Sequence, residues 1–279
     1  MSFPPLETAE GQSTILVTGA TGNAGGELVR VLEAGNHPVL PLVRGPDGLP
    51  DLNRPASLRP VLEGVRGLFL LAGYDDMPGV LKEAAQAGVE RVVLLSGSSA
   101  ESRDTANAIS RYMIRSEEAV RASGLSWTIL RPHAFMSNAL RWAPQLAAGD
   151  IVHAQFPYAV STVIDPYDLA SVAAMALTSP GHDGATYRLT GPEALRPEDQ
   201  VRILSDALGR NLTFVGLTDD ETRAELSQTA PPEYVDAFWS FYVDGALDES
   251  VRTPTVAEVT GRSPRSFQQW ASDHVQAFR

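Results

Sequence analysis

Short apolar runs alternate with helical patterns through the first half of the chain. We expect buried strands over Ile15–Val17, Pro38–Val43, Gly67–Ala72, Arg91–Leu95 and Trp127–Leu130, since apolar runs between turn residues are typical of strands. Strands that are apolar throughout and alternate with helices indicate a parallel sheet covered on both faces. The pattern therefore predicts an α/β fold, a doubly wound parallel sheet of the Rossmann type.

Helical spacing of apolar residues fills the intervals between these runs. It covers Asn23–Ala34, Gly79–Ala87 and Thr105–Ser123, and a glycine follows each segment directly. A glycine at that place is typical of a helix C-terminus, where the backbone turns into the left-handed region. These three segments are the predicted helices of the first half.

The alternation loosens after residue 131. We expect helices over Phe135–Ala148, Tyr167–Leu177, Pro197–Leu208 and near Phe267–Phe278, and strands over Ser161–Ile164 and Thr186–Leu189. Residues 13–154 then form the sheet domain, residues 160–190 complete its sheet, and residues 191–279 form a smaller, mainly helical C-terminal lobe. Because ligands of open α/β sheets lie outside the carboxyl ends of the strands, this lobe is the predicted substrate or lid lobe.

A glycine ladder connects the first strand to the first helix. Gly19, Gly22 and Gly25 have the spacing GxxGxxG, which allows a tight turn, close approach of a pyrophosphate and close packing of helix on strand. Amide groups at the helix N-terminus favour an anion there. We interpret the loop as a dinucleotide site, with a structural turn as the alternative. The residues assigned to it are Gly19, Thr21, Gly22, Asn23, Ala24 and Gly25.

The ends of the next strands supply further candidates for cofactor binding. Arg44 follows the second run, and a guanidinium there suits the 2′-phosphate of NADP. A solvated surface arginine is the alternative, and the nearby Asp47 leaves NAD possible. The other residues that we assign to the cofactor at strand ends are Ala72, Gly73, Ser96 and Pro132.

Four residues are candidates for the substrate pocket: Tyr74, Ser98, Phe135 and Trp239. Tyr74 can equally be a packing tyrosine, and Ser98 can equally belong to a turn or helix cap. Trp239 lies in an aromatic group with Phe241 and Tyr242 that is also typical of a helix core.

Tyr112 and His133 are the candidate proton donors. Short-chain dehydrogenases pair a catalytic tyrosine with a lysine four positions later, which lowers the pKa of the tyrosine. Here that position is Ser116, and Lys82, the only lysine of the chain, lies in an earlier helix. His133 titrates near neutral pH, although a structural histidine is the alternative. The usual Tyr/Lys pair is therefore absent.

The composition restricts the remaining classes of function. The chain has no cysteine and a net charge of -12, which removes thiolate chemistry and argues against nucleic acid as a partner. The histidines and acidic residues have no metal-binding spacing, so no metal site is expected. Without a predicted membrane span or targeting segment, we expect a cytoplasmic protein with a small-molecule substrate, and a homodimer or a protein partner is possible.

Several motifs together resemble the NmrA-like branch of the atypical short-chain dehydrogenases. They are VTGATGNAG from Val17, the segments around Asp51–Leu58 and Gly64–Leu71, SGLSWTILRP ending at Pro132, FMSN from Phe135, GATYRLTGP from Gly184, and TGRSP from Thr260 before Trp270. The resemblance covers nearly the whole chain.

This resemblance implies NAD(P) binding, usually NADP, with Arg44 near the 2′-phosphate and the loop after Pro132 near the nicotinamide. The chain departs from the family pattern in its short Arg44–Asp51 segment and in the missing lysine around Tyr112–Glu118. Two main hypotheses follow. One is an NADPH-dependent oxidoreductase acting on a small apolar quinone, carbonyl or imine without a Tyr/Lys pair. The other is a non-catalytic NADP(H) redox sensor that binds a protein partner, and an epimerase or lyase is a third.

Overall fold

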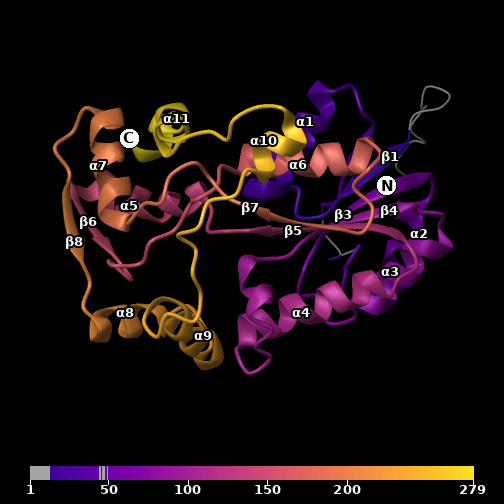
Figure 1. Cartoon of the computed structure of the whole chain (residues 1–279), viewed down its shortest axis with the longest axis horizontal. Helices are drawn as coiled ribbons and strands as arrows, with labels where there is room; N and C mark the ends of the chain where they lie inside the picture. Colours follow the sequence, from indigo (N-terminus) through magenta and orange to yellow (C-terminus); the bar gives the residue numbers. More distant parts are fainter. Residues whose placement is uncertain (1–12, 44, 46–47, 49) are drawn as a thin grey trace. The chain divides into compact units, whose positions relative to one another are not determined.

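A six-stranded sheet, in which the first five strands pair in parallel, is built mainly from the first half of the chain (Figure 1). The computed structural model describes residues 13–43, 45, 48 and 50–279. The strands are β1 (Thr14–Val17), β2 (Val39–Pro41), β3 (Val65–Leu71), β4 (Arg91–Leu95), β5 (Ser126–Pro132) and β7 (Ala185–Leu189). The doubly wound α/β fold predicted from the sequence is confirmed.

The strand order of the sheet is β2-β1-β3-β4-β5-β7. Strand β1 pairs in parallel with β2 on one side and with β3 on the other. The connections therefore reverse direction between β1 and β3, and such a switch point is where open α/β sheets bind ligands. The loops that follow β1 and β3 leave the sheet at this point, and they contain the glycine ladder and the pair Ala72–Gly73.

Helices cover both faces of this sheet (Figure 1). Helices α1 (Asn23–Ala34) and α6 (Pro166–Thr178) lie on one face, and α2 (Arg59–Leu62), α3 (Met77–Gln86) and α4 (Ala108–Arg121) lie on the other. Alternate strand residues such as Leu68 and Leu70 pack with Leu81 of α3 and Val120 of α4 in one buried core. A Cβ atom on Gly67, which faces the opposite way, would meet Leu177 of α6 at 3.3 Å. The period-two alternation of a strand thus supplies two cores.

The chain divides into two compact units that interleave in sequence. The first holds the described residues up to Leu95, together with Arg115–Leu130 and Ala170–Thr186, and the second holds Ser96–Ile114, Arg131–Leu169 and Tyr187–Arg279. The domain boundaries expected from the sequence, with a lobe starting at residue 191, stay a prediction.

The second unit combines a small sheet with short helices. Strands β6 (Ile151–Ala154) and β8 (Thr213–Gly216) pair in parallel. Its main core joins Trp142 and Leu146 to Leu204, Phe267 and Trp270. The helices are α5 (Ala143–Ala148), α7 (Pro197–Leu208), α8 (Asp219–Leu226), α9 (Pro232–Tyr242), α10 (Thr255–Thr260) and α11 (Phe267–Asp273), with 3₁₀ turns at Ser98–Ser102, Met136–Trp142 and Val275–Phe278.

Three predicted elements differ in the structure. The helix expected over Phe135–Ala148 is a 3₁₀ turn followed by α5, because Pro144 lacks an amide hydrogen and favours the start of a new helix. The strand expected over Ser161–Ile164 consists of isolated bridges to three different segments, so it forms no regular ladder. The last helix ends at Asp273, and a 3₁₀ turn follows.

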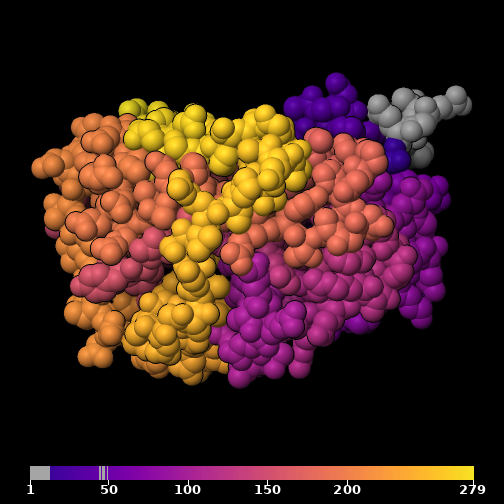
Figure 2. All heavy atoms as spheres, viewed as in Figure 1, coloured from indigo at the N-terminus to yellow at the C-terminus, as the bar shows by residue number. Residues whose placement is uncertain are grey.

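Residues 243–254, which we name the strap, connect α9 to α10. The strap runs over the molecular surface in gold in Figure 2. Its Thr253 donates hydrogen bonds from N to Thr190 Oγ1 and from Oγ1 to the carbonyl oxygen of Arg188, and its Glu249 pairs with Ser161 in an isolated bridge. The strap is therefore tied to the second unit along its length.

The described part of the chain has neither a membrane-spanning helix nor a cluster of metal-binding side chains. None of its helices combines the length and the apolar character that crossing a membrane requires. Its histidine, aspartate and glutamate side chains form no group of three or more that could hold a metal ion.

Candidate cofactor and substrate site

The glycine loop is built on backbone positions that a side chain would disturb. Gly19 has a φ of +64°, a conformation that favours glycine. A Cβ atom on Gly25 would lie 2.3 Å from the carbonyl oxygen of Gly19, and one on Gly19 would lie 2.6 Å from Leu71 Cδ1. The loop, the first turn of α1 and the end of β3 thus pack closely.

The start of α1 is open to an anionic ligand. No side chain caps this helix terminus, and its first turn has no acidic residue. Thr21, Gly22 and Asn23 are exposed. Because the first amide groups of a helix have no partner within the helix, an uncapped, exposed terminus offers hydrogen bonds and a positive dipole end. These features fit the pyrophosphate of a dinucleotide.

The loop after β3 is held beside the glycine ladder by Thr18 and Ser116. The Thr18 Oγ1 atom accepts a hydrogen bond from Leu71 N at 3.1 Å. Gly73, with a φ of +97°, donates its amide hydrogen to Ser116 Oγ at 3.0 Å. Ser116, four positions after Tyr112 in the sequence, thus supports the backbone of a predicted cofactor-binding residue.

In the second unit, the buried carboxylate of Glu249 accepts hydrogen bonds from three separate segments of the chain. Its oxygens accept hydrogen bonds from Ser98 Oγ at 2.8 Å, from Ser161 Oγ at 2.9 Å and from Ala134 N at 3.3 Å. Glu249 is only 5% exposed. Buried carboxylates are stable where hydrogen bonds replace water, so the strap and the turns that follow β4 and β5 are joined at this group.

His133 lies against the backbone of the same residue. Its Nδ1 atom is 2.7 Å from Thr162 Oγ1 and 3.0 Å from the carbonyl oxygen of Glu249. The ring is 2% exposed, and Nε2 has no hydrogen-bond partner among the described residues. Burial lowers the pKa of the His133 imidazole, although the nearby Glu249 opposes this effect. The neutral ring is therefore the resting form at neutral pH.

Tyr112 belongs to an aromatic cluster around α9. Its ring stacks on Tyr234 with the centroids 6.4 Å apart, and Phe238 and Tyr242 pack against the same core. Burial raises the pKa of the Tyr112 phenol. Trp239 extends the cluster through Phe156 and is covered by the Arg223 guanidinium, 4.7 Å from the ring centroid. A neutral phenol without a nearby lysine is a weak proton donor.

The remaining residues that the sequence predicts for the site differ in burial and in the groups that they contact. Tyr74 is half-buried against the core of the first unit. Ser96 is buried near Met113, with its Oγ 3.8 Å from Sδ. Phe135 forms an isolated bridge with Ile164. Ala72 and Pro132 stand at the ends of β3 and β5, and Arg44 lies outside the described residues.

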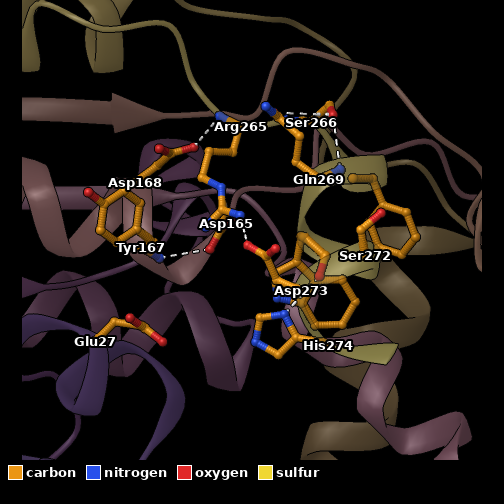
Figure 3. A network of polar contacts seen from close by, with 12 residues as sticks. Glu27, Asp165, Tyr167, Asp168, Arg265, Ser266, Gln269, Ser272, Asp273 and His274 are labelled. Atoms are coloured by element: carbon orange, nitrogen blue, oxygen red, sulfur yellow. Dashed lines mark hydrogen bonds and ion pairs between the residues drawn. The ribbon is translucent and has the colours of Figure 1, made fainter. Parts of the chain in front are cut away.

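Asp165 caps the start of α6, which begins at Pro166. Asp165 Oδ1 accepts a hydrogen bond from Tyr167 N at 2.9 Å. In the first turn of this helix, the carboxylate of Asp168 accepts hydrogen bonds from Arg262 Nη1 at 2.6 Å and from Arg265 N at 2.7 Å. Figure 3 shows the contact with Arg265. Both arginines stack on Tyr167. The TGRSP motif therefore ties the C-terminal segment to the start of α6.

Glu249, Thr162 and Ser161 were not found from the sequence. They lie in irregular segments without a motif, and only the fold brings them to His133 and Ser98. The sequence does point to Ser116, because it lies four residues after Tyr112, the spacing at which short-chain dehydrogenases have a lysine after the catalytic tyrosine.

Comparison with known proteins supports the dinucleotide interpretation of this geometry. Residues 19–180 match a family described as NAD(P)H-binding. The chain belongs to this family. The match starts at the first glycine of the ladder and continues through α6.

Two curated relatives match almost end to end. A (4-alkanoyl-5-oxo-2,5-dihydrofuran-3-yl)methyl phosphate reductase of Streptomyces griseus is 39% identical over 95% of this chain and 99% of its own length. An NAD(P)H azoreductase of Xenophilus azovorans is 32% identical over 95% of this chain and 99% of its own length.

Solved structures share the fold. The NADPH-dependent quinone oxidoreductase QOR2 of Escherichia coli, complexed with NADPH, has a TM-score of 0.75 at 21% identity, over 93% of this chain and 99% of that one. A mutant of NmrA has a TM-score of 0.70 at 19% identity, over 95% and 96%. The expected NAD(P)H-binding family is thus confirmed, and the likeness to NmrA is one of fold.

Proposed function

We propose that this protein is an NADPH-dependent reductase that transfers hydride to a small, planar, conjugated acceptor. The glycine loop carries the proposal, because Gly25 has no room for a side chain and the α1 terminus beside it is uncapped. Membership of the NAD(P)H-binding family and two reductases at 39% and 32% identity support the oxidoreductase class. The redox-sensor hypothesis has no comparable support.

The residues divide into a binding group and a substrate group. Gly19–Gly25 would hold the pyrophosphate, with Ala72, Gly73, Ser96 and Pro132 along the rest of the cofactor and Arg44 at a 2′-phosphate. The reduced nicotinamide supplies the hydride when it is bound. Tyr74, Ser98, Phe135 and Trp239 are the proposed substrate contacts, and Tyr112 and His133 are the proposed polar groups beside the reacting atoms.

The proposed acceptors are quinones, carbonyl compounds and imines. The names of the two relatives extend this range to azo compounds and unsaturated furanones. Hydride transfer to such acceptors depends mainly on orientation and exclusion of water, which agrees with the absence of a Tyr/Lys pair. A cytoplasmic location and a homodimer or protein partner belong to the same proposal, and they rest on the sequence features alone.

A panel of acceptors tests the reductase function. Purified protein should oxidise NADPH in the presence of at least one quinone, azo dye, unsaturated furanone, imine or aldehyde, followed through the loss of NADPH absorbance. Gly25→Val should weaken NADPH binding at least about tenfold, because the new side chain collides with the backbone of Gly19.

Gly149→Val is the matched control for this substitution. Gly149 has a φ of 170°, which any residue adopts, and nothing lies within 4 Å of a Cβ atom built on it. This variant should bind NADPH like the wild type. No turnover of any acceptor by the wild type would reject the reductase proposal, and equal NADPH binding by both variants would reject the role of the loop.

A further inference from the structure

The hydrogen bonds around His133 determine which ring nitrogen carries the proton. Nδ1 lies 3.0 Å from the carbonyl oxygen of Glu249, which can only accept. Thr162 Oγ1, 2.7 Å from Nδ1, donates its own hydrogen to that carbonyl oxygen. Nδ1 therefore faces two oxygen atoms that can accept a hydrogen bond, Glu249 O and Thr162 Oγ1. An unprotonated Nδ1 would place its lone pair against those of the carbonyl oxygen, which is unfavourable. These contacts favour the neutral tautomer that carries its proton on Nδ1.

The opposite nitrogen is left as a bare acceptor. Nε2 is buried and has no partner among the described residues, and Ser137 Oγ, four residues further along the same turn, is also buried without one. Most buried polar groups have a hydrogen-bond partner, so such atoms call for an explanation. Both follow β5, in the loop that the family resemblance implies to lie near the nicotinamide.

We propose that His133 accepts a hydrogen bond from the substrate through Nε2, with Thr162 and Glu249 as the positioning residues that keep its proton on Nδ1. The substrate class is then a conjugated acceptor that carries an O–H or N–H group. This inference rests on the proposed reductase function and changes the role of His133 in it from proton donor to hydrogen-bond acceptor.

Glu249 positions the ring through its backbone and its side chain together. The carbonyl oxygen that faces Nδ1 also accepts the amide hydrogen of Thr162 at 2.8 Å. The carboxylate of the same residue holds Ala134 N, directly after His133 in the chain. Displacement of the strap at Glu249 would therefore move both the acceptor and the ring.

The tautomer can be measured without substrate or cofactor. In full-length protein with ¹⁵N-labelled histidine, long-range ¹H–¹⁵N spectra should give His133 a protonated Nδ1 and an unprotonated Nε2 from about pH 6 to about pH 8. The chain has five histidines, and the loss of signals in His133→Gln assigns this one. A His133 ring protonated on Nε2 overturns the inference.

Thr162→Val tests the positioning role. Removal of the hydroxyl should shift the tautomer ratio toward Nε2–H about fivefold, the effect of one hydrogen bond. Thr162→Ser should restore the wild-type ratio. Thr260→Val in α10 is the matched control, since Thr260 Oγ1 also donates to a carbonyl oxygen, that of Val256. An unchanged ratio in Thr162→Val would overturn the role of Thr162.

The kinetics distinguish an acceptor from a proton donor. An accepting His133 must be neutral, so kcat/KM should fall toward acid pH, whereas a donating His133 would make it fall toward alkaline pH. The charged groups that influence this titration are Glu249, Asp248, Glu101 and Arg188. His133→Gln, which offers an oxygen near the position of Nε2, should retain about fivefold more activity than His133→Phe.

A matched pair of substrates completes the test. The wild type should prefer a naphthoquinone with a ring hydroxyl over the same quinone without it, and His133→Phe should lose this preference. If the enzyme is active but shows no preference, only the present inference fails. If no acceptor of the panel is reduced, the proposed function fails and the substrate part of the inference fails with it, while the spectra still decide the tautomer.

Discussion

Arg44 is the residue that we propose to set a preference for NADP. A guanidinium that follows the second strand in the sequence can pair with a 2′-phosphate through charge-assisted hydrogen bonds, which contribute about 1.5 to 3 kcal/mol. Arg44→Ser should therefore lower the ratio of kcat/KM for NADPH to that for NADH by about tenfold or more. Steady-state kinetics with both cofactors measure this ratio.

A second surface arginine serves as the control for this experiment. Arg202 is 64% exposed in its side chain and lies near Asp199 on α7, so Arg202→Ser removes the same charge elsewhere. It should leave the cofactor ratio unchanged. An unaltered ratio in Arg44→Ser would assign NADP binding to other groups, or identify NAD as the natural cofactor.

Residues differ in how far the sequence reveals their roles. The requirement for glycine at positions 19 and 25 is local, because the spacing itself reflects a turn next to a helix start, and the structure bears out both steric arguments. Glu249 is the opposite case. Its hydrogen-bond partners Ser161 and Ser98 lie 88 and 151 positions away, and no local pattern identifies a buried carboxylate in an irregular strap.

At the level of elements, the start of α6 allows a test of pH dependence. Burial raises the pKa of the Asp165 carboxyl, against the opposing effects of Tyr167 N and Arg265. The folded state then holds the proton more tightly than the unfolded chain does. The contribution of Asp165 to the free energy of unfolding is therefore greatest below its unfolded pKa, about 3.9, and falls as the pH rises through the folded pKa.

Asp165→Asn removes this titration and keeps an oxygen for the cap. Relative to this variant, the wild type should lose stability as the pH rises from about 4 to about 7. Asp165→Ala also removes the hydrogen bond to Tyr167 N and should lower the free energy of unfolding by about 1 kcal/mol at neutral pH. Urea unfolding at several pH values measures both effects. A wild type that gains stability over Asp165→Asn with rising pH would contradict the argument.

Elements with strong local signals were the ones predicted well. Strand β4 and helices α1 and α7 have the predicted bounds. The strand is a distinct apolar run, and each of the two helices combines apolar periodicity with a glycine or proline boundary. Strands β6 and β8 were missed. Each has four residues, their partners are separated by about sixty positions, and their pairing depends on tertiary contacts that a local pattern does not contain.

For the whole molecule, the division into units leads to a prediction about truncation. The core of the second unit packs Trp142 and Leu146 against Phe267 and Trp270, so it needs residues from both sides of position 190. A fragment of residues 1–190 would expose this apolar surface and should fail to unfold cooperatively, measured by near-ultraviolet circular dichroism during urea denaturation beside the full chain. Cooperative unfolding of the fragment would instead support the sequence-based boundary at residue 191.

The sheet could be predicted as a whole, whereas the second unit could not. A run of buried parallel strands has a regular signal in each segment, and topology rules order it. The second unit is assembled from three stretches of chain, and its helices are mostly short. The aromatic group on α9 was visible in the sequence, but its partner Phe156 in the loop after β6 was not.

The hydrogen bond between Gly73 and Ser116 has a consequence for any attempt to build a Tyr/Lys pair into this protein. Ser116 lies four positions after Tyr112, and its hydroxyl already supports the loop after β3. Ser116→Lys would remove that support at the same step as it supplied the lysine. New activities are therefore better sought by substitution of the proposed substrate-side residues.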